Sequence, residues 1–191
     1  MCIRDRPAGQ RYNNSVKVDG DKSLIVNTEI FNHGYINRKA FVVSVPVNNI
    51  HKLQEGQEVI VHHNIFRRWH NIKGVEKNSR GFLNEEEYLA SPDQIYMYNN
   101  NGWSCVNGYT FVKPIKSKDN YSNNLERPLV GIVKYSDGSF LPTQLVGFTP
   151  SSEYEFVVDG ERLYRVMNKF ITIKYEYKGD EEEYNPSWAE S

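Results

Sequence analysis

The chain has 191 residues, and its 23 Lys and Arg nearly balance its 24 Asp and Glu, which gives a formal net charge of −1. A charge this close to neutral excludes a uniformly basic or acidic surface that binds partners by charge alone. No apolar run approaches the roughly 20 residues that a membrane-spanning helix needs, so the sequence predicts a soluble protein without such a helix. The 13 Tyr residues favour strands over helices.

The N-terminus and the cysteines indicate origin and compartment. Residues 1–6, MCIRDR, are similar to a translated adapter segment that recurs in assembled environmental sequence. We therefore interpret them as an artefact, leave them out of the predicted fold, and expect a metagenomic or viral source. No apolar signal segment accompanies them. The two cysteines, Cys2 and Cys105, have neither disulfide-framework nor metal-ligand spacing, which favours a reducing cytoplasm.

Short apolar or alternating segments run along the whole chain, and helical periodicity is almost absent. Turn signals such as Asp-Gly and Asn-Gly separate these segments. Many short strands at near-regular spacing are typical of a barrel or a sandwich, so the predicted fold class is all-β. The predicted strands are residues 24–30, 40–47, 58–62, 94–98, 109–115, 130–135, 155–158 and 171–177.

The two halves of the chain resemble each other, which indicates an internal duplication. Residues 87–95 match residues 162–171. The first copy carries extra residues at 64–81, a segment that the second copy shortens to 149–154. The earlier matches are Val26 with Val112, Arg38 with Arg127, and Val42 with Ile132.

The longest polar stretch, residues 99–102, marks the predicted boundary between the copies. We expect an N-terminal segment at 1–14, a first module at 15–99, a second at 100–177 and an acidic tail at 178–191. The tail is expected to be solvated, although Trp188 could anchor it on a neighbouring subunit.

One family resemblance rests on the order of these blocks. The first copy has Arg38 before a strand at 40–45 and then the block 53–61, in which Gln57 stands where the family has Asp. The second copy has TFVKPI at 110–115, a polar loop, LVGIV at 129–133, DGERLYRV at 159–166 and ITI at 171–173. This order resembles the GroES co-chaperonin module, which implies two tandem small β-barrel modules.

The resemblance also implies a function and a partner. A GroES-like protein forms a homo-oligomeric ring, typically a heptamer, and caps a GroEL-type chaperonin through an apolar segment on a mobile loop, without a cofactor. Two positions for that loop remain open. If residues 24–27 form the first strand, the docking residues are Ile30, Phe31, Tyr35 and Ile36; if residues 15–18 do, they are Leu24, Ile25 and Val26. The expected place of action is the cytoplasm, that of the host for a viral protein.

Other chemistries are less favoured by the residues. His62 and His63 are neighbours that would face opposite sides of a strand, and neither they nor His70 have a Cys or acidic partner at ligand spacing, so we expect no metal site. The basic and aromatic residues 66–69 could contact single-stranded nucleic acid, but the near-neutral charge argues against it. No nucleophile elbow or phosphate loop is present, so we expect no enzyme activity. The alternative function is a phage structural or assembly protein built from small β-barrels.

Overall fold

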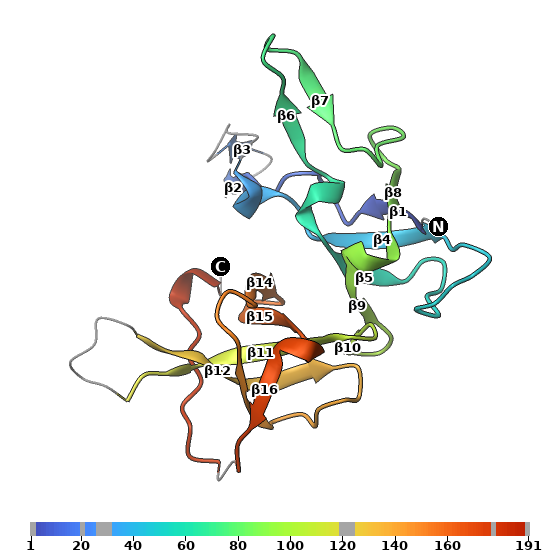
Figure 1. Ribbon diagram of the computed structural model, residues 1–191. Helices are drawn as coiled ribbons and strands as arrows, with labels where there is room; N and C mark the ends of the chain where they lie inside the picture. Colours follow the sequence, from blue (N-terminus) through green and yellow to red (C-terminus); the bar gives the residue numbers. More distant parts are fainter. Residues whose placement is uncertain (1–2, 20–21, 26–31, 119–124, 177–178, 190–191) are drawn as a thin grey trace. The chain divides into compact units, whose positions relative to one another are not determined.

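The computed structural model describes residues 3–19, 22–25, 32–118, 125–176 and 179–189. The chain divides into two compact units, Met1–Gly102 and Trp103–Ser191, each dominated by strands (Figure 1). The helical segments in the described part are single turns of 3-10 helix. In that part no helix has the length and apolarity needed to cross a bilayer. The prediction of an all-β fold is confirmed.

The first unit is organised around one antiparallel sheet. Its strand order is β10-β9-β5-β4-β1-β8, and the turn between β9 and β10 contains the boundary with the second unit. Two hairpins, β2–β3 and β6–β7, pair only within themselves. The elements are β1 (Ile3–Pro7), β2 (Ser15–Asp19), β3 (Lys22–Ile25), η1 (His33–Tyr35), β4 (Lys39–Ser44), β5 (Glu58–Val61), η2 (His63–Ile65), β6 (Arg68–His70), β7 (Glu76–Asn78), β8 (Tyr88–Ala90), η3 (Pro92–Gln94) and β9 (Ile95–Asn99). Strand β10 (Trp103–Cys105), at one edge of this sheet, follows the boundary in the chain.

The second unit has its own antiparallel sheet, in the order β14-β15-β11-β12-β13-β16. Its elements are β11 (Tyr109–Lys116), β12 (Glu126–Ser136), β13 (Leu145–Phe148), β14 (Tyr154–Val158), β15 (Glu161–Met167), η4 (Asn168–Phe170), β16 (Ile171–Lys174) and η5 (Ser187–Ala189). Alternation of apolar residues along these strands buries one cluster against the sheet. That cluster consists of Val112, Val133, Phe140, Val146, Phe148 and Val166.

The two units share a strand order, which agrees with the predicted duplication. Five consecutive strands of the first sheet, β8-β1-β4-β5-β9, follow the same sequence of positions as β15-β11-β12-β13-β16 of the second. A 3-10 turn, η3 or η4, comes directly before the last strand in each. The matched segments 87–95 and 162–171 lie at this shared place, on β8–β9 and β15–β16.

Three expectations are corrected by the strands. Neither sheet closes: β10 and β8 are the edges of the first sheet and β14 and β16 those of the second, so the predicted barrels are wrong. The counterpart of β11 is β1, so the first sheet begins before residue 15; Val26, which the duplication matched with Val112, lies outside the described residues. The exclusion of residues 1–6 from the fold is wrong for residues 3–6, which lie in β1 between β4 and β8.

The acidic tail is also more ordered than predicted. The amide of Lys116 donates to the carbonyl of Glu182, and the amide of Tyr184 donates to the carbonyl of Pro114. Ile115 and Glu183 form an isolated antiparallel bridge. The tail occupies this place because β15 pairs with β11 only at residues 109–112, which leaves the later residues of β11 open on that side.

Candidate functional site

The β2–β3 hairpin lies in the connection between β1 and β4, residues 8–38. The corresponding connection of the second unit, between β11 and β12, is residues 117–125. Ser15 pairs with Ile25 and Val16 with Leu24 across the hairpin. Its four exposed apolar side chains are Val16 (53%), Val18 (65%), Leu24 (58%) and Ile25 (60%). A hairpin that exposes this much apolar surface is suited to a partner, since single exposed apolar residues are common but such groups are not.

The predicted docking residues are separated by the fold. Leu24 and Ile25 are exposed on β3, whereas Ile36 is buried and bridges to Tyr12. Tyr35 is half-buried in η1, and its carbonyl accepts a hydrogen bond from the amide of Asn13. The remaining three, Val26, Ile30 and Phe31, lie outside the described residues.

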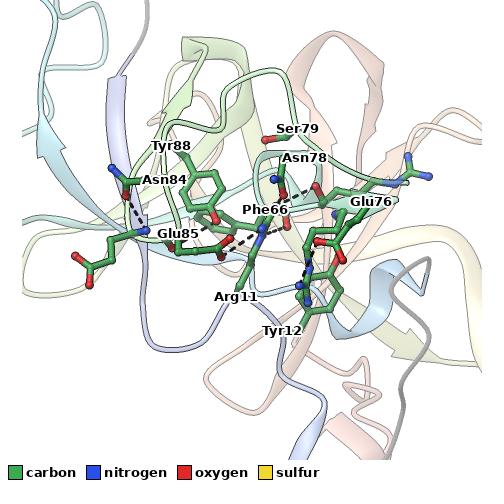
Figure 2. Close-up of polar contacts among 12 residues, drawn as sticks. Arg11, Tyr12, Phe66, Glu76, Asn78, Ser79, Asn84, Glu85 and Tyr88 are labelled. Carbon is green, nitrogen blue, oxygen red and sulfur yellow. Dashed lines mark hydrogen bonds and ion pairs between the residues drawn. The ribbon is translucent and has the colours of Figure 1, made fainter. Parts of the chain in front are cut away.

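A second feature of this connection is Arg11, which the sequence analysis did not single out. The side chain is almost fully buried, and Figure 2 shows it reaching into the segment that follows β5. Its Nε donates to the carbonyl oxygen of Phe66 at 2.7 Å, and its Nη2 donates to the carbonyl of Arg67 at 3.3 Å and to Asn78 Oδ1 at 2.7 Å. One guanidinium therefore holds the two ends of the β6–β7 hairpin together.

Two aromatic rings and one carboxylate surround the Arg11 guanidinium. The rings of Phe82 and Tyr88 have centroids 5.4 and 5.2 Å from the guanidinium carbon, a cation–π arrangement. Glu85 Oε2 lies 3.5 Å from Nη1. Burial raises the pKa of Tyr88 to about 12, so its ring stays neutral beside the cation.

A second set of contacts fixes the same hairpin. The amide of Arg68 donates to the Tyr12 hydroxyl at 2.9 Å, and the Arg68 guanidinium lies over the Tyr12 ring and 3.5 Å from Glu76 Oε1. The Ser79 hydroxyl donates to the carbonyl of Ile65 at 2.5 Å. The hairpin base is thus tied to the connection between β1 and β4 by both Arg11 and Tyr12 (Figure 2).

The anchored segment borders an open surface cavity of about 520 Å³. It lies largely in the stretch that the first copy has and the second shortens, residues 64–81. Two arginines, an indole and several amides and hydroxyls share the cavity wall. The lining residues are Asn64, Ile65, Arg67, Trp69, Ser79, Arg80, Gly81, Leu89, Ser91, Asp93 and Gln94.

Three histidines gather next to this segment. β5 ends at Val61, so His62 and His63 do not alternate along a strand as expected; their rings stack with centroids 4.4 Å apart. The ring of His33 lies 5.3 Å from that of His63. Burial first, and then its neighbours His62 and Arg38, lower the pKa of His63 to about 3. Over the described ranges, no three His, Cys, Asp or Glu side chains are grouped so as to hold a metal ion.

The polar groups of the second unit are arranged differently. Arg162 donates to Glu126 and Glu155, and Tyr164 donates to Glu126 at 2.6 Å. These hydrogen bonds hold the pKa of Arg162 above its usual value although burial opposes this. The partners are carboxylates on strands β12 and β14, so this network joins neighbouring parts of one sheet rather than a projecting hairpin.

The two features suited to binding, the exposed β2–β3 hairpin and the arginine-lined cavity, thus both belong to the first unit. Comparison with known proteins gave no relative: no family model, no curated protein and no solved structure matches this chain.

Proposed function

We propose that this protein is a co-chaperonin-like cap, which binds a GroEL-type chaperonin ring through the β2–β3 hairpin and assists protein folding in the cytoplasm of its host. The observation that carries the proposal is the exposure of Leu24 and Ile25 on a hairpin inserted between two neighbouring strands, β1 and β4. In the GroES-like order of the sequence blocks, the connection between β1 and β4 stands where that family has its docking loop. The repeated sheet supports the accompanying proposal of tandem GroES-like modules.

The hairpin form favours docking energetically. Ordering a flexible loop costs about 1–2 kcal/mol per residue, so residues already paired in β2 and β3 bind at a lower entropic cost. Burying apolar surface contributes about 25 cal/mol per Å², which leaves a single hairpin as a weak ligand. A homo-oligomeric ring, for which we propose seven copies, presents several hairpins at once and raises the affinity by effective concentration.

The difference between the two connections favours the first unit as the part that docks. Its connection holds a hairpin with four exposed apolar residues, whereas the described ends of the 117–125 connection offer Leu125 alone. Ser117 donates its amide to the carbonyl of Leu125, which closes the base of that loop.

The second candidate is a phage structural or assembly protein. The open sheets favour it, because the edge strands β14 and β16 present unpaired main-chain groups that another strand can complete. This candidate requires a homo-oligomer or a filament but no chaperonin.

Binding to an ATP-loaded GroEL-type ring tests the proposal directly. Replacing Leu24 and Ile25 together with Ser should abolish binding while the unfolding midpoint stays unchanged, since both side chains are exposed. Leu141→Ser removes an equally exposed apolar side chain from the second unit and should leave binding intact. The pair Ile30→Ser and Phe31→Ser tests the other loop position.

Mass measurement of the purified protein separates the two candidates. A closed ring that binds the chaperonin supports the cap. A ring or filament that binds no chaperonin would transfer the proposal to the structural protein, and a monomer at micromolar concentration would contradict both.

A further inference from the structure

The wall of the cavity beside the β6–β7 hairpin contains charged hydrogen-bond donors. Arg67 and Arg80 both line it. Within the described residues neither guanidinium has a hydrogen-bond or ion-pair partner, in contrast to Arg11, Arg68 and Arg162. Two unpaired guanidinium groups in one concavity leave planar, charged donors available to an anion.

The indole of Trp69 lines the same cavity and is half-buried. It stands on β6 between Arg68, which is held by Tyr12 and Glu76, and His70. The contacts of Arg68 fix the backbone of β6, which places the Trp69 indole at the cavity wall. Leu89 and Ile65 supply apolar surface in the same cavity, and the side-chain amide of Asn64 adds a donor and an acceptor.

The backbone on two sides of the cavity is held by close contacts. A Cβ on Gly81 would lie 2.1 Å from the carbonyl oxygen of Leu89, so the chain at residue 81 packs directly on β8. The amide of Leu89 donates to the carbonyl of Gly81 at 2.7 Å and fixes that contact. Arg11 fixes the opposite side through the carbonyls of Phe66 and Arg67.

The electrostatic surroundings favour an anion. Burial first, and then neighbouring positive charges that include Arg38 and Arg67, lower the pKa of His63 to about 3. The cavity wall itself carries two arginines against one carboxylate, Asp93. The net charge of the chain is −1, so this positive region is local.

We propose that this cavity binds a nucleotide, with the base stacked on the Trp69 indole and the phosphate held by Arg67 and Arg80. An inorganic anion would leave the indole unused, and an uncharged ring would leave both guanidiniums unused. The volume of about 520 Å³ lies within the usual range of ligand pockets, about 300–1,000 Å³. Base stacking on an aromatic side chain tolerates any base, so the site recognises the class rather than one sequence.

The nucleotide has two possible sources, a free mononucleotide or one residue of a single strand. Calorimetric titration of the full chain with adenosine monophosphate, adenosine, inorganic phosphate and a short thymidine oligonucleotide distinguishes them. Adenosine and phosphate alone should bind at least about tenfold more weakly than the mononucleotide, because each lacks one of the two contacts. Tighter, salt-sensitive binding of the oligonucleotide identifies a strand, and equal or weaker binding identifies the free nucleotide.

Matched variants assign the binding to this cavity. Arg80→Gln and Trp69→Leu should each weaken binding about tenfold or more. Lys77→Gln removes a positive charge from the same hairpin but does not line the cavity, and its affinity should stay within about twofold. Failure of all four probes to bind, or binding that Arg80→Gln and Trp69→Leu leave unchanged, overturns the proposal. Chaperonin binding plays no part in this experiment, so the two proposals fail independently.

Discussion

The first and second units have the same central strand order but place different material between the strands. Between β1 and β4 the first unit holds residues 8–38 with a hairpin, where the second has residues 117–125. Between β5 and β8 it holds η2 and the β6–β7 hairpin, where the second has the single strand β14. Both candidate binding features lie in these longer connections. The shared sheet therefore serves as a scaffold, and loops supported by it carry the specific surfaces, as is common in proteins.

The central strands also differ at one buried position. Asp5 of β1 is fully buried, and its two carboxylate oxygens have no hydrogen-bond partner on any other described residue. Register places Val112 of β11 at the equivalent point. Asp5 lies opposite Val42 and Tyr88, and Val112 lies opposite Val133 and Tyr164. An apolar residue suits this position better than a buried carboxyl does.

Replacing Asp5 with Val should give the largest effect, a stabilisation. Desolvation by burial raises the pKa of Asp5 from 3.8 to about 8, so the folded state favours the neutral acid. Below pH 3.8 Asp5 is neutral in both states and ionisation costs the fold nothing. As the pH rises from 3.8 to about 8, the free energy of unfolding falls by about 1.4 kcal/mol per pH unit, because only the unfolded state can ionise this group. Urea unfolding should show that the gain from Asp5→Val is roughly 3–4 kcal/mol larger at pH 8 than at pH 5.

Glu55→Gln is the control for this experiment, because Glu55 is exposed and should change the free energy of unfolding by less than about 0.5 kcal/mol at either pH. A gain from Asp5→Val that does not depend on pH would show that Asp5 is ionised in the folded state.

Removing the buried arginine of each unit sharpens the comparison further. Arg11→Met should destabilise the protein by about 3 kcal/mol, because it leaves buried carbonyl groups of the Phe66–Arg67 segment without a donor. Arg162→Met should cost less, about 1–2 kcal/mol, because Glu126 and Glu155 are partly exposed and can be hydrated. Chemical denaturation measures both.

The position of the Arg11 effect distinguishes anchoring from general packing. Hydrogen exchange should accelerate in β6 and β7 when Arg11 is replaced, with β12 and β15 unaffected. Uniform acceleration across both units would contradict a local anchoring role. Arg11→Lys should recover little of the loss, because an ammonium group cannot reproduce the planar set of donors.

The smallest expected effect concerns the tail, which only the second unit has. Lys113 Nζ lies 2.6 Å from Glu183 Oε2 and 3.1 Å from Glu161 Oε1. Glu183→Gln should reduce stability by less than about 1 kcal/mol, because half of the Glu183 side chain is exposed and Glu161 remains as a partner. The change should shrink further in high salt. A larger, salt-independent loss would indicate that the tail depends on this pair rather than on its main-chain bonds to β11.

The fold class and several strands could be predicted from sequence because they depend on local pattern. The strands predicted at 40–47, 58–62 and 109–115 overlap β4, β5 and β11, although β4 already ends at Ser44 and β5 at Val61. The three-residue strands β6, β7 and β8 escaped prediction because such short segments have no measurable periodicity. β1 was missed for another reason: the origin assigned to residues 1–6 excluded them, although any extended segment can supply the main-chain groups that β4 and β8 require.

The candidate sites, too, could be predicted from the sequence only in part. The sequence by itself determined that Leu24, Ile25 and the 66–69 segment are apolar or basic-aromatic clusters, since these are properties of neighbouring residues. Only the tertiary structure decided that Ile36 is buried, that Arg11 bonds to carbonyls 55 and 56 residues away, and that Arg80 and Leu89 meet Trp69 at one cavity. A lone arginine has no periodic signal, and its partners are set by which strands pair. Whether neighbouring histidines stack or diverge likewise depended on where β5 ends.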